Sequence, residues 1–318
     1  MLFTYLATLI ILLAFEVAYI IFAGKLRIVD KPHLQSSHKG LIVRGGGVIF
    51  YIGYILWCTF TGHYYPHFFV GITILAAVSF ADDLFTVSPK LRLVCQFAAI
   101  VLLLYQIGLL RSTNYPVVII LSIACVGAVN IYNFMDGING MTGGYSLVVL
   151  LALLYMNEHY RQFADTRLLV NVILAVIVFL IFNFRKRAAC FAGDVGSLTI
   201  GFIVVFFVLK MALVNKSMSW IAFLSVYFVD GGLTILHRIL HKENLMKPHK
   251  KHAYQIMANE LKIPHIVVSS IYMTMQAICC IVFILWPNYF TFFAEFSILT
   301  GLYLWFIKKY YYLHVKNQ

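Results

Sequence analysis

Long apolar runs separated by short polar segments are the feature that most constrains the fold of this chain. An α-helix crosses the bilayer core of about 30 Å with about 20 predominantly apolar residues, and such runs recur from one end of the sequence to the other. Hydrophobic residues make up 62% of the chain and charged residues only 11%. The sequence therefore predicts an all-α, polytopic membrane protein rather than a soluble protein with one large core.

Eleven apolar runs are bounded by polar residues, glycine or proline, and each predicts a transmembrane helix whose ends are good to a few residues. The first run has no basic residue before it and no small-residue cleavage site, so we expect a retained helix and not a signal peptide. No repeat or linker divides the chain, which predicts a single integral-membrane domain over residues 1–318. The predicted spans are 2–23, 47–61, 67–81, 92–110, 116–132, 143–156, 168–184, 197–214, 219–236, 265–286 and 289–306.

The basic residues distinguish the two sides of the membrane. If the spans alternate in direction, 19 of the 24 lysines and arginines fall on one side. Loops rich in lysine and arginine face the cytoplasm, and most of the acidic residues lie on or beside the same loops. The predicted cytoplasmic loops, numbered one to five, are 24–46, 82–91, 133–142, 185–196 and 237–264.

Loop two begins with the adjacent carboxylates of Asp82 and Asp83 at the end of an apolar helix. Adjacent carboxylates repel one another, and near a membrane this cost is usually offset by a cation, a bound Mg²⁺ or a proton. Lys90 and Arg92 follow closely, so one interpretation is an anionic ligand shared between acids and bases. A solvated pair at the interface is the other interpretation.

Loop three contains the motif NIYNFMDGINGMTGG, residues 130–144. Asn130, Asn133 and Asp136 are spaced by three and share one face if the helix continues that far. Amide and carboxylate oxygens suit Mg²⁺, which takes one or two protein ligands alongside phosphate oxygens. A helix end followed by a glycine turn would explain the glycines but not this polar face, so we favour a metal site.

Loops four and one add glycine-rich turns. Loop four contains FAGDVGSLTIG, residues 191–201, in which Asp194 is a compact oxygen donor. Ser197 is placed to cap the next helix, whose N-terminus would favour phosphate. Loop one ends in RGGG, residues 44–47, and we expect its N–H groups to approach an anion.

Loop five is rich in basic residues and histidine. Arg238, His249 and His252 are suited to hold phosphate, and an arginine can grip it with two parallel hydrogen bonds. The two histidines could instead bind zinc, but no cysteine or carboxylate stands at ligand spacing with them. A basic loop lying on anionic lipid is a further alternative, although it accounts for the lysines and not for PHKKHAYQ, residues 248–255.

Taken together, the five loops resemble the polyprenyl-phosphate N-acetylhexosamine-1-phosphate transferase superfamily, which includes phospho-MurNAc-pentapeptide translocase. Five motifs carry the resemblance, in the family's order: DKPHLQSSH with RGGG, ADDL, NIYNFMDGINGMTGG, GDVGS, and Arg238 with PHKKHAYQ. The resemblance implies that a UDP-activated amino sugar gives its sugar 1-phosphate to undecaprenyl phosphate and leaves UMP. It also implies that Mg²⁺ is required, with Mn²⁺ as an alternative metal.

The resemblance implies a role for each matching residue. Asp82 and Asp83 would meet the lipid phosphate, one of them as a base, and Asp136 would act beside them in a metal or nucleotide role. Asn133 and Asp194 would bind the metal. The residues that would bind the substrates are Asn130, Lys90, Arg92, Arg238, His249 and His252.

Two departures from the family's pattern indicate which members the chain resembles more closely. Asn139 stands where many bacterial members have aspartate, so we interpret a second carboxylate there as dispensable. The chain also lacks the triple histidine and the PTMGG loop of the peptidoglycan translocase, which is the alternative within the family. The resemblance is closer to enzymes that initiate O-antigen, enterobacterial common antigen or capsule synthesis with GlcNAc, GalNAc or a 6-deoxy relative.

The resemblance implies a bacterial inner-membrane protein whose active site faces the cytoplasm. Its expected partners are the two substrates and membrane lipid, not nucleic acid, and a homodimer stays open. A secondary transporter is the alternative of another class, but its site would lie near the bilayer midplane, whereas the acids here cluster at one face. Asp230 is the exception because it lies within a span, where pairing with loop five and catalysis are equally good interpretations.

Overall fold

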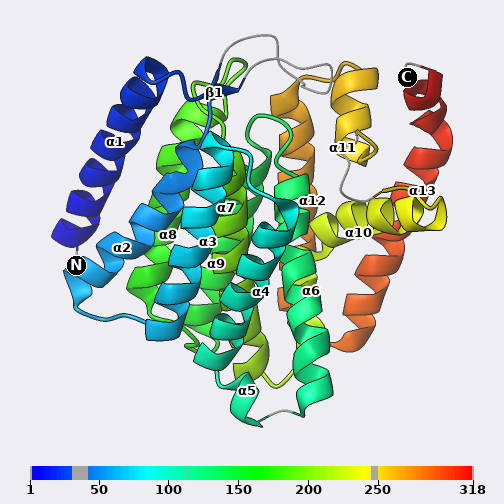
Figure 1. The fold of residues 1–318 in the computed structure, drawn as a ribbon. Coiled ribbons are helices and arrows are strands. Elements are labelled where there is room, and N and C mark those ends of the chain that lie inside the picture. The colour runs from blue at the N-terminus through cyan, green and yellow to red at the C-terminus, as the bar shows by residue number, and fades with distance from the viewer. Residues whose placement is uncertain (1, 31–41, 113, 245–249, 317–318) are drawn as a thin grey trace.

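The computed structural model describes residues 2–30, 42–112, 114–244 and 250–316, and it confirms the all-α architecture (Figure 1). Short segments complete the fold: the 3-10 helices η1 Gly46–Val48 and η2 Met218–Leu224, the π-helical η3 Ile256–Glu260, and the strands β1 Val29–Asp30 and β2 Ile42–Val43. The α-helices are α1 Leu2–Lys25, α2 Ile49–Thr61, α3 Pro66–Leu84, α4 Pro89–Gln106, α5 Leu109–Ser112, α6 Tyr115–Phe134, α7 Met141–His159, α8 Thr166–Asn183, α9 Gly193–Val214, α10 Ser225–Leu240, α11 Ala253–Gln255, α12 His265–Leu285 and α13 Tyr289–Lys316.

Within the described ranges, nine helical segments are long and apolar enough to cross a membrane, counting η2 and α10 as one segment. The two other predicted spans also correspond to helices, span 47–61 to α2 and span 143–156 to α7. The predicted span 92–110 divides into α4 and the short α5. The polytopic membrane architecture is therefore confirmed, and the count of eleven crossings stays a prediction.

Helix α9 lies at the centre of the bundle. In its most apolar stretch 83% of the residues are buried, against 22% in α1 and 17% in α13 at the periphery. It packs against α2, α3, α6 and α7, and the small Gly201 lets α6 come close, since a Cβ there would lie 2.9 Å from the Cβ of Tyr132. A helix that is apolar on all sides is expected to be buried. Because α9 carries Asp194 in its first turn, this packing also positions that carboxylate.

The ninth predicted span, 219–236, is not one straight helix. It begins as η2 and continues as α10, which runs across the direction of the neighbouring helices in Figure 1. Gln276 of α12 occupies the junction, where it donates to the Ala222 carbonyl at 3.4 Å and accepts from the Val226 N–H at 3.2 Å. A side chain inserted into the backbone hydrogen bonds is a known cause of helix kinks. The local sequence does not predict this bend because Gln276 belongs to a distant segment.

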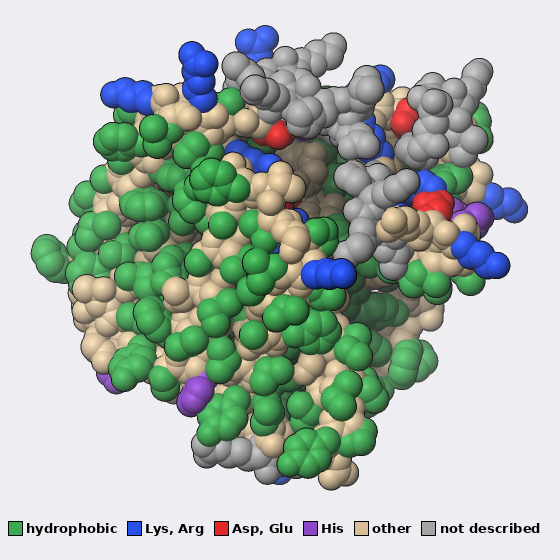
Figure 2. All heavy atoms as spheres, in the orientation of Figure 1, with side chains coloured by type: hydrophobic (Ala, Val, Ile, Leu, Met, Phe, Trp, Pro, Cys, Tyr) green, Lys and Arg blue, Asp and Glu red, His purple; other side chains and the backbone are tan. Residues whose placement is uncertain are grey.

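Lysine and arginine side chains gather at one end of the bundle, at the top of Figure 2. We call this end the basic face; loops one to five, which follow α1, α3, α6, α8 and α10, meet there. In loop one, β1 pairs antiparallel with β2, Val29 opposite Val43 and Asp30 opposite Ile42. Val43 also bridges to Cys190 in loop four. Loop one is therefore attached directly to loop four.

Candidate active site

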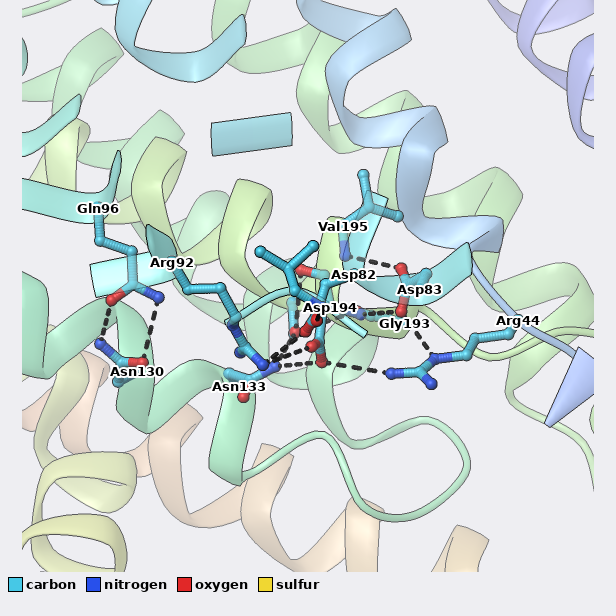
Figure 3. Close-up of polar contacts among 12 residues, drawn as sticks. Arg44, Asp82, Asp83, Arg92, Gln96, Asn130, Asn133, Gly193, Asp194 and Val195 are labelled. Carbon is cyan, nitrogen blue, oxygen red and sulfur yellow. Dashed lines mark hydrogen bonds and ion pairs between the residues drawn. The ribbon is translucent and has the colours of Figure 1, made fainter. Parts of the chain in front are cut away.

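The side chain of Asp83, near the end of α3, lies between loop one and the start of α9 (Figure 3). Its Oδ1 accepts from the Asp194 N–H at 2.9 Å and lies 2.7 Å from Arg44 Nε, and its Oδ2 accepts from the Val195 N–H at 3.0 Å. The side chain is 0% exposed. The first N–H groups of a helix have no partner within the helix, and Asp83 supplies one for two of them in α9.

The neighbouring Asp82 makes a different set of contacts. Its Oδ2 lies 2.5 Å from Arg92 Nη1, and its Oδ1 accepts from the Val87 N–H at 2.8 Å. The same Arg92 nitrogen lies 3.3 Å from Asp194 Oδ2. One arginine therefore bridges two carboxylates and supplies positive charge that adjacent acids require.

Arg44 also belongs to this cluster, although the sequence alone did not predict a role for it. Its Nη2 lies 3.7 Å from Asp194 Oδ1, in addition to its contact with Asp83. Tyr19 of α1 holds the backbone there by donating its hydroxyl to the Arg44 carbonyl at 2.8 Å. The available signal is the position of Arg44 directly before three glycines in a loop predicted to face the same side as the acids.

Asn133, in the last turn of α6, meets Asp194 directly. Its Nδ2 donates to Asp194 Oδ1 at 2.9 Å and to Ser197 Oγ at 3.0 Å. The prediction that Ser197 caps the following helix is wrong, because α9 begins at Gly193 and Ser197 Oγ donates back to the Gly193 carbonyl at 3.0 Å. The shared helical face is also incomplete, since α6 ends at Phe134 and Asp136 lies beyond it.

The prediction that the RGGG amides approach an anion is wrong for Gly46 and Gly47. Their N–H groups donate to the carbonyls of Phe191 and Ala192, at 2.9 and 3.0 Å. A Cβ at Gly47 would lie 2.3 Å from the Cα of Gly196, so the two backbones approach too closely for any side chain. These glycines allow loops one and four to pack against each other.

A cavity of about 290 Å³ lies beside Asp194. Burial raises the pKa of the Asp136 carboxyl, which lies outside the spans, to about 7; Asp194 and Asp83 add to the rise, and Thr142 and Arg44 oppose it. Carboxylates, amides and a guanidinium around one cavity suit a ligand that carries phosphate. The lining residues come from loops one, three, four and five and their borders: Asp30, Arg44, Asn133, Asp136, Gly137, Ile138, Asn139, Asn183, Phe191, Gly193, Asp194, Gln255 and His265.

Asp230 of α10 is buried at the start of α11, and the structure favours the pairing interpretation over catalysis. His252, which is 1% exposed, places Nδ1 3.3 Å from Asp230 Oδ1. The carboxylate therefore holds the end of loop five in place. It also accepts hydrogen bonds from the Thr234 hydroxyl (3.3 Å), the Ala253 N–H (3.1 Å), the Tyr254 N–H (3.4 Å) and the Tyr272 hydroxyl (2.6 Å).

Two other predicted residues of loop five do not line the cavity, and a third is not described by the structure. Arg238 is 3% exposed, with Nε 3.3 Å from Glu243 Oε2 and Nη2 donating to the Asn244 carbonyl at 2.6 Å. Neither Arg238 nor His252 is among the described residues that line the cavity. His249 lies outside the described residues, as does most of DKPHLQSSH in loop one. The roles predicted for these residues stay predictions.

Two predicted substrate-binding residues lie at the edge of the site. Asn130 donates to Gln96 Oε1 at 2.8 Å and accepts from Gln96 Nε2 at 3.3 Å, so it joins α6 to α4 (Figure 3). Lys90 is exposed in the first turn of α4. Gln96 was not singled out from the sequence, although a polar side chain in an apolar span is a signal for such a partner.

Oxygen donors for a metal are grouped at the end of α6 and the start of α9. Asn133 and Asp194 are in contact, and Asp136 lines the same cavity. Among the residues that the structure describes, no three His, Cys, Asp or Glu side chains gather closely enough to hold a metal by themselves. Mg²⁺ usually takes one or two protein ligands together with water and phosphate. The donors therefore fit Mg²⁺ bound with a phosphate and do not form a closed zinc site.

The family model of glycosyl transferase family 4 matches residues 65–212. This stretch holds loops two to four and with them Asp82, Asp83, Asn133, Asp136 and Asp194. In this stretch, a little under half of its length, the chain is similar to glycosyl transferase family 4. The polyprenyl-phosphate sugar-1-phosphate transferases that the five loops resemble are thus confirmed as its relatives.

Proteins similar to the chain include bacterial transferases. An undecaprenyl-phosphate alpha-N-acetylglucosaminyl 1-phosphate transferase of Escherichia coli (strain K12) is 30% identical over 206 residues, 59% of this chain and 56% of that protein. The protein of the same name from Yersinia pestis is 27% identical, over 78% of this chain and 75% of its own length. A probable undecaprenyl-phosphate N-acetylglucosaminyl 1-phosphate transferase of Bacillus subtilis (strain 168) is 25% identical, over 73% and 70%. The chain thus spans a little over half the length of the Escherichia coli relative.

Proposed function

We propose that the protein transfers an N-acetylhexosamine 1-phosphate from a UDP-sugar to undecaprenyl phosphate. The observation that carries the proposal is the convergence of Asp82, Asp83 and Asp194 with Arg44 and Arg92 beside one cavity at the end of a membrane bundle. The names of the relatives specify the same acceptor lipid and N-acetylglucosaminyl 1-phosphate. The bias of basic residues supports a cytoplasmic position for this face, in the inner membrane of a bacterium.

The proposed reaction exchanges one phosphoanhydride bond for another. An oxygen of the lipid phosphate attacks the phosphorus that carries the sugar, the bond from that phosphorus to UMP breaks, and UMP leaves with the bridging oxygen. Both substrates are anions, so positive charge is the main requirement of the site. Arg44 and Arg92 supply it from opposite sides of Asp194. A phosphate monoester is largely ionised near neutral pH, so a strong base is not needed.

Asp194 and Asn133, with Asp136 nearby, would hold Mg²⁺ or Mn²⁺. The bound ion would add positive charge against the diphosphate. Three features support this assignment: the donors are all oxygens, they line one cavity, and that cavity has room for a phosphate beside them. Asp136 would need its ionised form to bind a cation, which its raised pKa makes sensitive to pH near 7.

GlcNAc is the sugar to test first, because the relatives carry it in their names. GalNAc and the 6-deoxy amino sugars are the next candidates. Transfer of any of them would start the synthesis of a cell-envelope polysaccharide such as O-antigen or capsule.

A panel of radiolabelled UDP-sugars tests the proposal. Purified protein is incubated with undecaprenyl phosphate, Mg²⁺ and each sugar nucleotide, and label is followed into the lipid phase. We expect label from UDP-GlcNAc or a close relative, and its loss on addition of EDTA. Label only from UDP-MurNAc-pentapeptide would replace the proposal with the peptidoglycan translocase. Dissipation of a vesicle gradient without a lipid product would favour a secondary transporter.

A further inference from the structure

The two carboxylates of the Asp82 and Asp83 pair are in different environments, although they are adjacent in sequence. The Asp83 side chain is 0% exposed and the Asp82 side chain 9%. Both oxygens of Asp83 face donors of its own protein: two consecutive N–H groups of α9 and the Arg44 guanidinium. A carboxylate with this set of donors is already satisfied, and it has no exposed oxygen to meet a substrate.

The backbone at the start of α9 leaves space for the Asp83 carboxylate. Gly193 has a φ of +70°, a left-handed conformation that favours glycine. A Cβ at Gly193 would lie 2.5 Å from Asp83 Oδ2. The turn that begins α9 therefore depends on glycine for its conformation and for the space that the carboxylate occupies.

The residues that Asp83 contacts include two that line the cavity of the proposed active site. Its oxygens bind the N–H of Asp194 and the guanidinium of Arg44, and both of these residues line the cavity. Asp83 itself is not among the described lining residues. It is attached to α3, which packs along the central α9, so it links the bundle to the first turn of α9.

We propose that Asp83 is a positioning residue, which anchors the first turn of α9 and sets the places of Asp194 and Arg44. It does not exchange a proton with the lipid phosphate. This inference rests on the proposed function for its meaning in catalysis, and it replaces the catalytic role that the family resemblance implies for Asp83.

Hydrogen–deuterium exchange tests the anchor without any substrate. In purified protein in detergent, we expect amide exchange in a peptide covering residues 191–198 to accelerate at least about tenfold in Asp83→Ala, because the Asp194 and Val195 N–H groups lose their acceptor. Gly193→Ala should have a similar effect while the carboxylate remains. The matched control is Asp165→Ala, which removes the cap of α8, where Asp165 Oδ1 accepts from the Arg167 N–H at 2.8 Å. It should leave peptide 191–198 unchanged.

Comparison of Asp83→Asn with Asp83→Ala separates positioning from proton transfer. Asparagine keeps one oxygen acceptor and is a good helix cap, so Asp83→Asn should retain at least about five times the transfer rate of Asp83→Ala. It should also bind Mn²⁺, followed by electron paramagnetic resonance, more tightly than Asp83→Ala, because Asp194 stays closer to its place. A base would be lost equally in both variants.

The outcomes are decisive in either direction. Unchanged exchange at residues 191–198 in Asp83→Ala overturns the inference, as do equal losses of transfer in the Asn and Ala variants. If the wild-type protein transfers no sugar phosphate, the proposed function fails, and the exchange and Mn²⁺ measurements still decide whether Asp83 holds the start of α9.

Discussion

Asp83 and Asp230 are two aspartates with buried side chains that make the same kind of backbone contact in different surroundings. Each lies on a helix of the bundle and accepts hydrogen bonds from two consecutive N–H groups at the start of another helix, α9 for Asp83 and α11 for Asp230. The residues around them differ. Asp83 is paired with Arg44 beside the cavity, whereas Asp230 is surrounded by His252, Tyr272 and Thr234.

The difference shows that burial and saturation by donors do not by themselves indicate catalysis. The helix that Asp83 holds carries Asp194 in its first turn, and Asp194 lines the cavity. The helix that Asp230 holds contains Tyr254, whose hydroxyl donates to the Phe134 carbonyl at 2.8 Å. Asp83 therefore positions residues of the cavity wall directly, whereas Asp230 positions loop five, which in turn contacts loop three.

The largest expected effect on the Asp83 side is the loss of Asp194 itself. Asp194→Ala should lower transfer at least about a thousandfold, which corresponds to about 4 kcal/mol at 1.36 kcal/mol per tenfold change. The cause is the loss of a proposed metal ligand that also orients Arg44 and Arg92. The measurement is the UDP-sugar assay, with folded protein quantified by gel filtration in detergent. Activity within tenfold of wild type, at equal folded yield, would contradict this site.

On the Asp230 side, we expect the main effect on stability. Asp230→Ala leaves several buried donors without their acceptor and should lower the free energy of unfolding by about 3 kcal/mol. Thermal unfolding in detergent measures this loss. The turnover of the protein that remains folded should stay within about threefold of wild type. A large loss of turnover at unchanged thermal stability would show that Asp230 is catalytic and would contradict its structural role.

A smaller effect is expected when the positive charge of Arg44 is kept but its shape is changed. Arg44→Lys loses the planar fork that reaches both Asp83 and Asp194, so we expect transfer to fall about tenfold to a hundredfold. Arg167→Lys is the matched control, because Arg167, in the first turn of α8, pairs with Asp165 at 2.9 Å and neither residue lines the cavity. Equal effects of the two substitutions would show that Arg44 has no special position.

The smallest expected effect concerns the link from loop five to loop three. Tyr254→Phe removes only the hydroxyl that bonds the Phe134 carbonyl, which is worth about 1 kcal/mol. We expect kcat to fall by up to about fivefold with little change in the UDP-sugar KM, since the loop that carries Asp136 is held less firmly. Tyr115→Phe, at an exposed tyrosine, should have no effect. A wild-type kcat in Tyr254→Phe would show that the effect of Asp230 and its neighbours does not extend beyond loop five.

Several site residues could be predicted from the sequence because their signals are local. Asp82, Asp83, Asn133 and Asp194 stand out as polar groups at the ends of apolar runs, and the structure brings all four together. The basic residues then indicate which loops share a side of the membrane. Membership of one cluster could thus be predicted, whereas the contacts inside the cluster could not.

Other features depend on partners that no local pattern reveals. Arg44 joins the site through a loop whose glycines look like an anion-binding turn but pack on loop four. Asn130 lies three residues before Asn133 but hydrogen-bonds to Gln96. A spacing of three residues predicts a shared helix face but does not specify which neighbouring side chain each residue contacts. His252 is a side-chain type that suits a phosphate ligand, and its sequence context does not reveal that it is buried beside Asp230.

The sequence by itself determined the membrane architecture, the basic face and the set of acids that gather there. These follow from apolar length, charge and spacing, which act along the chain and add up over many residues. Only the tertiary structure decided that Asp83 is enclosed, that Arg44 lies beside Asp194, and that α10 turns across the bundle at Gln276. Each of these depends on a hydrogen bond or ion pair between segments far apart in sequence, and such a partner is selected by packing rather than by composition.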